Sequence, residues 1–429
     1  MTNYFKDKKI TVMGLGLLGR GVGDVEFLAQ NGADLIVTDL KTKKQLQVSL
    51  DRLKKFKKIK YVLGKHRLED FKDRDMILKS AGVPLDSIYI KEAKKNKIPV
   101  EMSASLVAKL SDAKIIGITG TRGKSTVTQM IYEILKASKK KVFLGGNVRG
   151  IATLPLLEST KKGDYIVMEL DSWQLQGFGE GNISPHIAVF TNLMRDHMNY
   201  YKGSMAKYFT DKANIYKYQK KGDYLIAGKE IARKIKDSPL LKPKKLPESW
   251  KLKVAGEHNR ENASLAREVA SKAGVSEKII KKTLENFKSV EGRLEYMKAV
   301  RGVKIYNDNN ATTPDATIMA LRALGDTSKN IVLIMGGADK NLDMKPLLKE
   351  IEKYCKSVVL LSGTGTDKLK NLKFEYKKAN NLKDGIMQAL KDSKQGDIVL
   401  FSPAFASFGL FENEYDRNDQ FIELVKKLK

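Results

Sequence analysis

A glycine-rich stretch with a lysine and neighbouring hydroxyls, GITGTRGKST, spans residues 117–126. It is close to a phosphate-binding loop, although the usual motif has a glycine six residues before the lysine, where this chain has Ile118. The apolar run KIIGI precedes it and the amphipathic run STVTQMIYEILKA follows, which indicates a strand, a loop and a helix. Backbone amides at such a helix start converge on phosphate oxygens. A glycine turn without a ligand is the alternative.

The chemistry that this loop predicts is the binding of ATP. Lys124 would bring positive charge to the β- and γ-phosphates, and a hydroxyl of Ser125 or Thr126 would reach Mg²⁺. We expect the phosphates to lie against Gly120, Thr121, Arg122, Gly123, Lys124, Ser125 and Thr126.

Candidate metal ligands follow two neighbouring apolar runs. Glu169 ends YIVMEL, and Asp196-His197 follows IAVFTN and its loop. A carboxylate at the end of a parallel strand lies at the edge where phosphates bind, and Mg²⁺ prefers such oxygen ligands. Each residue could equally be a polar group satisfied at a strand end.

A second glycine motif, Gly14-Leu-Gly16-Leu-Leu-Gly19, lies between the apolar run KITVMG and the helical GVGDVEFLAQNG. Asp39 ends the next apolar run, DLIVTD, about twenty residues further on. This is the fingerprint of a dinucleotide-binding βαβ unit, whose helix start favours a pyrophosphate. A tight turn without a ligand, NAD, or another diphosphate all remain open from these residues.

Short apolar runs recur along the chain in three sets, each run followed by a helix-compatible segment. This alternation is typical of mostly parallel sheets. We therefore predict an α/β protein with three domains: a Rossmann-like N-terminal domain (1–97), a central P-loop ATPase-type domain with a parallel sheet (98–290), and a Rossmann-like C-terminal domain (291–429).

The composition favours a soluble cytoplasmic protein. The chain has 429 residues, 42% of them hydrophobic, and no apolar run approaches the ~18 residues that a membrane span needs. Its N-terminus does not read as a secretory signal. The single cysteine, Cys355, excludes a disulfide within the chain and suits a reducing compartment.

The net charge of +29 has two explanations. One is a surface that binds nucleic acid or membrane, and the other is a general excess of lysine on solvated helices. The lysine-rich runs, such as DRLKKFKKIK, contain no recognisable nucleic-acid motif and no clustered arginine. We expect no nucleic-acid partner and no membrane insertion, and a positive field would suit polyanionic substrates.

Taken together, these motifs resemble the Mur ligase family, ATP-dependent amino-acid ligases of peptidoglycan precursor synthesis. The loop is similar to the family's T-G-T-N-G-K-[ST]-T, with Arg122 in place of asparagine. Further similar stretches follow in the family's order: GGNVRG (145–150), ELDSWQL (169–175), NLMRDHMNYY (192–201), GEHNRENASLA (256–266), EGRLE (291–295), YNDNNATTPDA (306–316), MGGADKNLD (335–343) and SPAFASFGLFENEYDRNDQF (402–421).

The resemblance implies a reaction and its substrates. The third domain is most similar to the D-glutamate-adding branch, so the resemblance implies ATP, two Mg²⁺ ions, UDP-N-acetylmuramoyl-L-alanine and D-glutamate, and we expect a monomer. The first domain, with SAGVP (80–84), would then hold UDP rather than NAD. The UDP-linked substrate would contact Gly14, Leu15, Gly16, Leu17, Asp39, Asn147, Ser172 and Gln174.

The resemblance also assigns roles near ATP and the amino acid. Ser125 and Glu169 would bind one Mg²⁺, and His197 a second. Lys212 matches a lysine that the family carries as a carbamate, whereas the residues alone suggest one more exposed lysine on a basic helix. Asn259, Asn262, Arg293 and Asp308 would surround the nucleotide, and Thr312, Lys340 and Ser407 would contact D-glutamate.

Four departures from the family pattern bear on specificity. Asn310 stands where lysine is usual, Gly292 where histidine is usual, Glu414 where an aromatic is usual, and Asp171 where serine is usual. A sister ligase with another acceptor or amino acid is therefore one alternative. A nucleic-acid-stimulated ATPase and a nicotinamide-dependent oxidoreductase are the alternatives from other classes.

Overall fold

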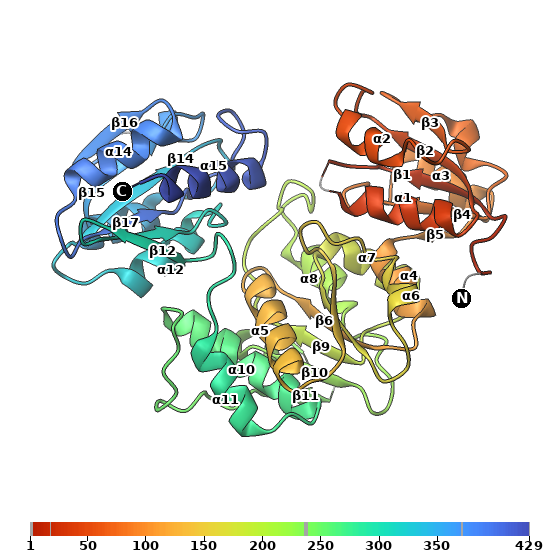
Figure 1. The fold of residues 1–429 in the computed structure, drawn as a ribbon, viewed down its shortest axis with the longest axis horizontal. Helices are drawn as coiled ribbons and strands as arrows, with labels where there is room; N and C mark the ends of the chain where they lie inside the picture. Colours follow the sequence, from red (N-terminus) through yellow and green to blue (C-terminus); the bar gives the residue numbers. More distant parts are fainter. Residues whose placement is uncertain (1–2, 18, 236–238, 370–371, 429) are drawn as a thin grey trace. The chain divides into compact units, whose positions relative to one another are not determined.

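The computed structural model describes residues 3–17, 19–235, 239–369 and 372–428 (Figure 1). The chain forms two compact units, Met1–Lys245 with Asn262–Ile280, and Leu246–Glu261 with Lys281–Lys429. The first unit contains two sheets and the second unit contains one. The predicted α/β class with three domains is therefore confirmed, with each domain built on its own sheet.

The first sheet is fully parallel, with the order β3-β2-β1-β4-β5. Its strands are β1 (Lys9–Met13), β2 (Asp34–Asp39), β3 (Lys60–Leu63), β4 (Met76–Lys79) and β5 (Val100–Glu101). Its helices are α1 (Arg20–Gln30), α2 (Gln47–Leu53), the 3₁₀ helix η1 (Leu68–Phe71) and α3 (Ile88–Lys95). The sequence predicts β1, β2 and β4 well, since each is a buried apolar run.

The central sheet is also fully parallel, with the order β11-β10-β9-β6-β8-β7. Its strands are β6 (Lys114–Thr119), β7 (Val142–Gly146), β8 (Tyr165–Glu169), β9 (Ile187–Phe190), β10 (Tyr224–Ala227) and β11 (Leu240–Leu241). The helices along this part of the chain are α4 (Ser103–Leu110), α5 (Lys124–Ala137), α6 (Leu156–Ser159), α7 (Ser172–Glu180), α8 (Met205–Ala213), α9 (Lys229–Ala232), α10 (Glu257–Lys272) and α11 (Glu277–Asn286).

The third sheet is mixed, with the order β12-β13-β17-β14-β15-β16. Its strands are β12 (Glu295–Val300), β13 (Val303–Asn307), β14 (Ile331–Gly336), β15 (Cys355–Leu361), β16 (Tyr376–Ala379) and β17 (Ile398–Phe401). Its helices are α12 (Pro314–Leu324), α13 (Lys345–Tyr354), the 3₁₀ helix η2 (Thr366–Lys368), α14 (Leu382–Asp392) and α15 (Glu414–Lys426).

The antiparallel pair β12–β13 is what makes the third sheet mixed. Its two connecting residues, Arg301 (φ 51°) and Gly302 (φ 76°), both have left-handed backbones. Two such residues form the tight turn that matches the twist of a hairpin. The short, half-exposed strands β3, β12 and β16 lack a strong apolar run, and the sequence analysis did not predict them.

The domain boundaries near residues 97 and 290 stay predictions. The last strand of the first sheet, β5, pairs with β4 through Val100 and Glu101, just beyond residue 97. On the other side, α10 crosses from the second compact unit into the first, because its start lies before Asn262. Secondary-structure runs in the sequence do not reveal such a crossing.

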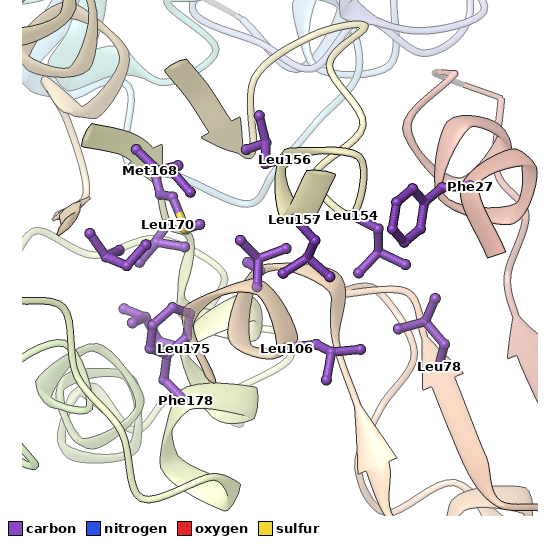
Figure 2. Close-up of a cluster of buried hydrophobic side chains, with 14 of the residues drawn as sticks. Phe27, Leu78, Leu106, Leu154, Leu156, Leu157, Met168, Leu170, Leu175 and Phe178 are labelled. Carbon is purple, nitrogen blue, oxygen red and sulfur yellow. The ribbon is translucent and has the colours of Figure 1, made fainter. Parts of the chain in front are cut away.

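A continuous apolar core joins the first sheet to the central sheet (Figure 2). Phe27 of α1 and Leu78 of β4 belong to the same buried cluster as Leu106 of α4 and Leu157 of α6. Burying large apolar side chains stabilises a fold by about 1.5–3 kcal/mol each. This shared core explains why the first two domains form one unit.

A buried carboxylate, Asp24 of α1, lies at the same junction. Its Oδ2 accepts a hydrogen bond from the Ser103 hydroxyl (2.5 Å), and its Oδ1 accepts from the backbone amides of Thr153 (3.1 Å) and Leu154 (2.9 Å). The preceding Gly23 leaves no room for a side chain, because a Cβ there would come 2.5 Å from the Cβ of Ala152. Asp24 therefore fastens α1 to the segment that follows β7.

Burial raises the pKa of Asp24 to about 6, while its hydrogen bonds act in the opposite direction. In the unfolded chain the pKa is near 3.8, so between these values the folded protein binds more protons. We predict that the free energy of unfolding falls as the pH rises from about 4 to about 6, by roughly 3 kcal/mol from this group.

The Asp24→Asn variant should lack this contribution, and chemical denaturation of both proteins across the pH range measures the difference. Ser103→Ala is the control, because it removes one hydrogen bond and keeps the buried acid, so its pH dependence should persist. Parallel pH profiles for wild type and Asp24→Asn would contradict the assignment.

Candidate active site

The loop between β6 and α5 is shaped by two glycines with positive φ, Gly120 (142°) and Gly123 (83°). A Cβ at Gly120 would come 1.9 Å from Oγ1 of Thr191, and one at Gly123 would come 2.5 Å from Oδ1 of Asn262. Only glycine fits both the backbone and the space at these positions. The shortened motif is thus a real tight turn at the start of a helix.

Residues that follow β9 hold the loop between β6 and α5 in place through hydrogen bonds. The amide of Thr121 donates to the Asn192 carbonyl (3.0 Å), and the amide of Arg122 donates to Asn192 Oδ1 (2.9 Å). The Thr121 hydroxyl accepts from the Met194 amide (2.9 Å). The loop is therefore positioned by several bonds to the neighbouring strand end rather than by its own glycines alone.

Lys212 of α8 lies directly beneath this loop. Its Nζ donates to the Gly120 carbonyl (2.9 Å) and to Oγ1 of Thr119 (3.3 Å), and lies 4.9 Å from the centre of the Tyr208 ring. The residue is only 1% exposed. The alternative of an exposed lysine on a basic helix is therefore wrong.

The burial of Lys212 lowers its pKa well below the ordinary lysine value, and the nearby charge of Lys124 lowers it further. Removing an ammonium from water favours its neutral form. The neutral amine is the nucleophilic form that can add CO₂, whereas the ammonium cannot.

Lys124 is the first residue of α5, and its side chain extends over the preceding loop. Its Nζ donates to the carbonyls of Gly120 (3.0 Å) and Thr121 (3.2 Å). Arg122 forms an ion pair with Asp196 (3.0 Å). Ser125 and Thr126 follow in the first turn of the helix, where backbone amides point toward the loop.

The two predicted metal ligands lie at neighbouring strand ends. Glu169 ends β8, is buried, and is in register with Ile118 of β6. His197 follows β9 with a left-handed backbone (φ 54°), and its ring centre lies 4.6 Å from that of Trp173. Both side chains thus belong to the carboxyl edge of the central sheet, the edge that carries the loop.

The first glycine motif forms a second loop, with positive φ at Gly14, Gly16 and Gly19. Asp39 is buried and uses its carboxylate within the protein, because Oδ2 accepts from the Gly16 amide (3.0 Å) and Oδ1 from the Lys41 amide (2.9 Å). Within this loop Leu15 is buried and Leu17 exposed. Asp39 therefore braces the loop.

The other residues predicted for the UDP-linked substrate come from the segment that follows β7 and from α7. Asn147 accepts a hydrogen bond from Arg20 of α1 through its Oδ1, which brings it next to the first glycine loop. Ser172 is buried at the start of α7. Gln174 forms a capping box with Asp171, whose side chain accepts from the Gln174 amide (2.7 Å).

The second unit brings together the residues predicted for the amino acid. The Nζ of Lys340 donates to Oγ1 of Thr312 (3.1 Å), and the bridge between Ala338 and Ala406 places Ser407 beside the same segment. Asp308 accepts hydrogen bonds from the Leu294 amide (3.0 Å) and the Ser402 hydroxyl (2.8 Å), so it is held next to the Arg293 backbone. The remaining nucleotide candidate, Asn259, lies one turn before Asn262 in α10.

Two of the departures from the family pattern contact each other. The Asn310 amide donates to the Gly292 carbonyl (2.9 Å), and a Cβ at Gly292 would come 3.0 Å from Nδ2 of Asn310 and 2.8 Å from Oδ1 of Asn418. Gly292 also has a left-handed backbone (φ 69°). A histidine at position 292 would be strained on this backbone and would displace the Asn310 and Asn418 side chains.

Three residues of the site were missed by the sequence analysis. Tyr208 packs beneath Lys212, Thr191 contacts the loop, and Arg20 binds Asn147. The four-residue spacing of Tyr208 and Lys212 predicts a shared helix face and could have revealed the first. The other two arise from contacts between distant segments, which have no signal in one sequence.

Within the described residues, no helix is both long and apolar enough to cross a membrane.

These features define a class of protein, in which a tight glycine turn lies at the carboxyl edge of a parallel sheet, in a chain that also contains two further α/β domains. Family models match three regions: a Mur ligase MurD-like N-terminal domain (residues 8–101), a Mur ligase middle domain (118–239) and a Mur ligase, glutamate ligase domain (292–405). The chain belongs to the Mur ligase family, as its motifs predict.

Curated relatives match over nearly the full length. The chain is 36% identical to the UDP-N-acetylmuramoylalanine--D-glutamate ligase of Borreliella afzelii, over 99% of this chain and 98% of that protein. It is 33% identical to the enzyme of the same name from Streptococcus agalactiae, over 99% and 98% of the two chains.

Solved structures share the fold. The UDP-N-acetylmuramate-alanine ligase of Thermotoga maritima matches with a TM-score of 0.64 and 21% identity, over 98% of this chain and 99% of that one. A MurF ligase from the same organism, solved in complex with ADP, matches with a TM-score of 0.61 and 17% identity, over 100% and 96%. At these identities the likeness concerns the fold.

The geometry of the loop predicts the effect of adding one methyl group. Gly120→Ala would place its Cβ against Thr191 on a backbone that side chains rarely adopt, so we expect ATP affinity to fall at least tenfold. The clash should also cost about 1–3 kcal/mol of unfolding free energy. Equilibrium ATP binding and chemical denaturation measure the two effects.

Gly163→Ala is the matched control, because Gly163 also has a positive φ (96°) but a Cβ there meets nothing within 4 Å. The free energy of unfolding of this variant should fall by about 1–2 kcal/mol, because alanine is strained on this backbone, and its ATP affinity should not change. Wild-type ATP affinity in Gly120→Ala would refute the loop as the phosphate site.

Proposed function

We propose that this protein is an ATP-dependent ligase that joins D-glutamate to UDP-N-acetylmuramoyl-L-alanine in peptidoglycan precursor synthesis. The observation that carries the proposal is the buried amine of Lys212, whose pKa lies well below the ordinary lysine value and whose Nζ contacts the glycine turn between β6 and α5. The names of the full-length relatives support the choice of substrates.

The first role in the proposal is that of the phosphate loop. The loop binds the ATP phosphates at the start of α5, and Lys124 neutralises their charge. The amides of Thr121 and Arg122 hold the loop in place through Asn192. Arg122 adds a further positive charge beside the phosphates. We propose that the adenine side of ATP contacts Asn259, Asn262, Arg293 and Asp308. This distribution follows the general logic of phosphoryl transfer, in which positioning and charge neutralisation supply most of the rate enhancement.

Mg²⁺ suits the residues present. Among the described residues no three His, Cys, Asp or Glu side chains gather into a ready-made metal centre. A buried Glu169 and the Ser125 hydroxyl nevertheless offer the hard oxygen ligands that Mg²⁺ prefers, and His197 lies at the same sheet edge. We propose two ions, which would supply charge neutralisation for the phosphates when bound.

A carbamate on Lys212 completes that ligand set. The neutral Nζ attacks CO₂, a C–N bond forms as one C=O π bond opens, and the nitrogen loses a proton to water. The neutral amine thereby becomes an anionic carbamate. An anion there would be stabilised by Lys124 and could support a metal, whereas an ammonium would repel it. The bond from Nζ to the Gly120 carbonyl fixes the position of that group.

The reaction itself then has two steps. The alanyl carboxylate of the UDP-linked substrate attacks the γ-phosphate, giving an acyl phosphate and ADP. The amine of D-glutamate attacks the acyl carbon, and phosphate leaves from the tetrahedral intermediate. The residues proposed for the UDP-linked substrate are Gly14, Leu15, Gly16, Leu17, Asp39, Asn147, Ser172 and Gln174.

We propose that Thr312, Lys340 and Ser407 bind the incoming D-glutamate. A lysine and two hydroxyls suit the carboxylates of D-glutamate. One observation favours a sister ligase with another amino acid as second candidate: Glu414 begins α15 near Arg417, and its charge acts on that buried guanidinium. A carboxylate close to the pocket would favour an amino acid with a less acidic side chain.

Phosphate release from ATP with a panel of acceptors and amino acids tests the proposal. We expect release to depend jointly on UDP-N-acetylmuramoyl-L-alanine and D-glutamate, because the acyl phosphate forms only on the first and is consumed only by the second. Release that is indifferent to D-glutamate, or that requires a different amino acid, would reject the D-glutamate assignment. Stimulation by nucleic acid would reject the ligase altogether.

The proposal also includes a cytoplasmic monomer without a nucleic-acid partner. One chain carries every residue that we propose for ATP and for the two substrates.

A further inference from the structure

A pocket of about 370 Å³ in the first unit lies outside every site discussed so far. It shares no residue with those proposed for ATP, the UDP-linked substrate or the amino acid. Its lining comes from the segment after β4, from α7, from the segment before α8 and from α8 itself: Leu85, Asp86, Gln176, Tyr200, Tyr201, Lys202, Lys207, Thr210 and Asp211.

The inner part of the pocket is a hydrogen-bonded group centred on Asp211. Its Oδ2 accepts from Nε2 of Gln176 (2.8 Å) and from the Tyr201 hydroxyl (2.9 Å). Nε2 of Gln176 also donates to the Tyr200 hydroxyl (3.0 Å). Burial raises the pKa of Tyr201, so its hydroxyl keeps the proton that it donates.

Two oxygen atoms of this group accept no hydrogen bond from the described residues. Gln176 is only 8% exposed, and its Oε1 is buried with no hydrogen-bond partner among the described residues. Asp211 is only partly buried, and its Oδ1 accepts none of the hydrogen bonds that the described residues donate to this carboxylate. A buried acceptor is unfavourable without a donor, so Oε1 of Gln176 favours a ligand that donates hydrogen bonds, and Oδ1 of Asp211 is available to accept a second one.

The charges and rings around these acceptors select the kind of donor. Asp211 attracts a cation, and the rings of Tyr200 and Tyr201, with centres 4.9 Å apart, suit an ammonium group. Lys207 lies one turn before Asp211 on α8, about 6 Å away along the same helix face. Lys202 adds positive charge and Asp86 negative charge at the exposed rim.

We propose that this pocket binds a small molecule with a primary ammonium group at one end and a carboxylate at the other. The ammonium donates to Asp211 and Gln176 at the inner end, and the carboxylate pairs with Lys207 and Lys202 at the rim. Because Asp211 directly precedes Lys212, an occupant contacts the helix that carries the buried amine without entering the proposed reaction site.

Three four-carbon probes separate the two ends of the ligand in isothermal titration with the full chain. γ-Aminobutyrate carries both groups, n-butylammonium only the cation, and butyrate only the anion. We expect γ-aminobutyrate to bind most tightly, n-butylammonium several-fold more weakly, and butyrate not at all. Equal binding of butyrate, or no binding of either amine, would overturn the proposal and leave a pocket that holds only water.

Variants locate the binding. Asp211→Asn keeps the shape and an acceptor for Gln176 and Tyr201, so it should fold, which thermal unfolding checks, and should weaken γ-aminobutyrate at least tenfold. Lys207→Ala should reduce γ-aminobutyrate to the affinity of n-butylammonium and leave the latter unchanged. Asp112→Asn, an exposed acid elsewhere in the unit, is the charge-matched control and should change nothing.

Lys340→Ala separates this inference from the proposed function. This variant should bind D-glutamate more weakly in the ligase reaction and should bind the three probes as the wild type does. Probe binding that is lost with Lys340→Ala, or kept in full by Asp211→Asn, would place the probes in a different site and contradict the proposal.

Discussion

Two lysine nitrogens share one carbonyl oxygen, and the rest of the site depends on that contact. Nζ of Lys124 (3.0 Å) and Nζ of Lys212 (2.9 Å) both donate to the carbonyl of Gly120. Two ammonium groups this close repel each other strongly where water is excluded. Burial is the larger reason that the pKa of Lys212 lies well below the ordinary lysine value, and the charge of Lys124 lowers it further. Both effects favour the neutral amine that the proposed reaction with CO₂ requires.

The fold supplies this contact by bringing three separate segments to one sheet edge. β6 places Gly120, the end of β9 holds the loop through Asn192, and α8 carries Lys212 underneath. The first domain is joined to this platform by a shared apolar core and by Asp24. In this chain the loop proposed for the nucleotide and the first domain thus belong to one compact unit.

The sequence predicts the local features well, and for a physical reason. Glycine spacing, apolar runs and helix starts are properties of a few neighbouring residues, so the loop at 120–126, most strands and α5 could be derived from them. The capping box of Asp171 and Gln174 is also a local feature with the expected three-residue spacing, although the sequence analysis did not predict it. The burial of Lys212 could not be derived in this way, since it results from a contact with Thr119, 93 residues away. The sequence analysis missed the hydrogen bonds of Asp24 because they join segments that lie far apart in the sequence. It missed the hairpin that makes the third sheet mixed because β12 is only weakly apolar.

The central claim is that Lys212 carries a reactive neutral amine, and ¹³C NMR with labelled bicarbonate tests it most directly. The protein also contains Lys79, another buried lysine, whose burial lowers its pKa to about 8 and whose Nζ donates to two carbonyls. We expect a carbamate resonance in the wild type that persists in Lys79→Met and disappears in Lys212→Ala. A wild-type protein without the resonance, or a Lys212→Ala variant that keeps it, would contradict the account.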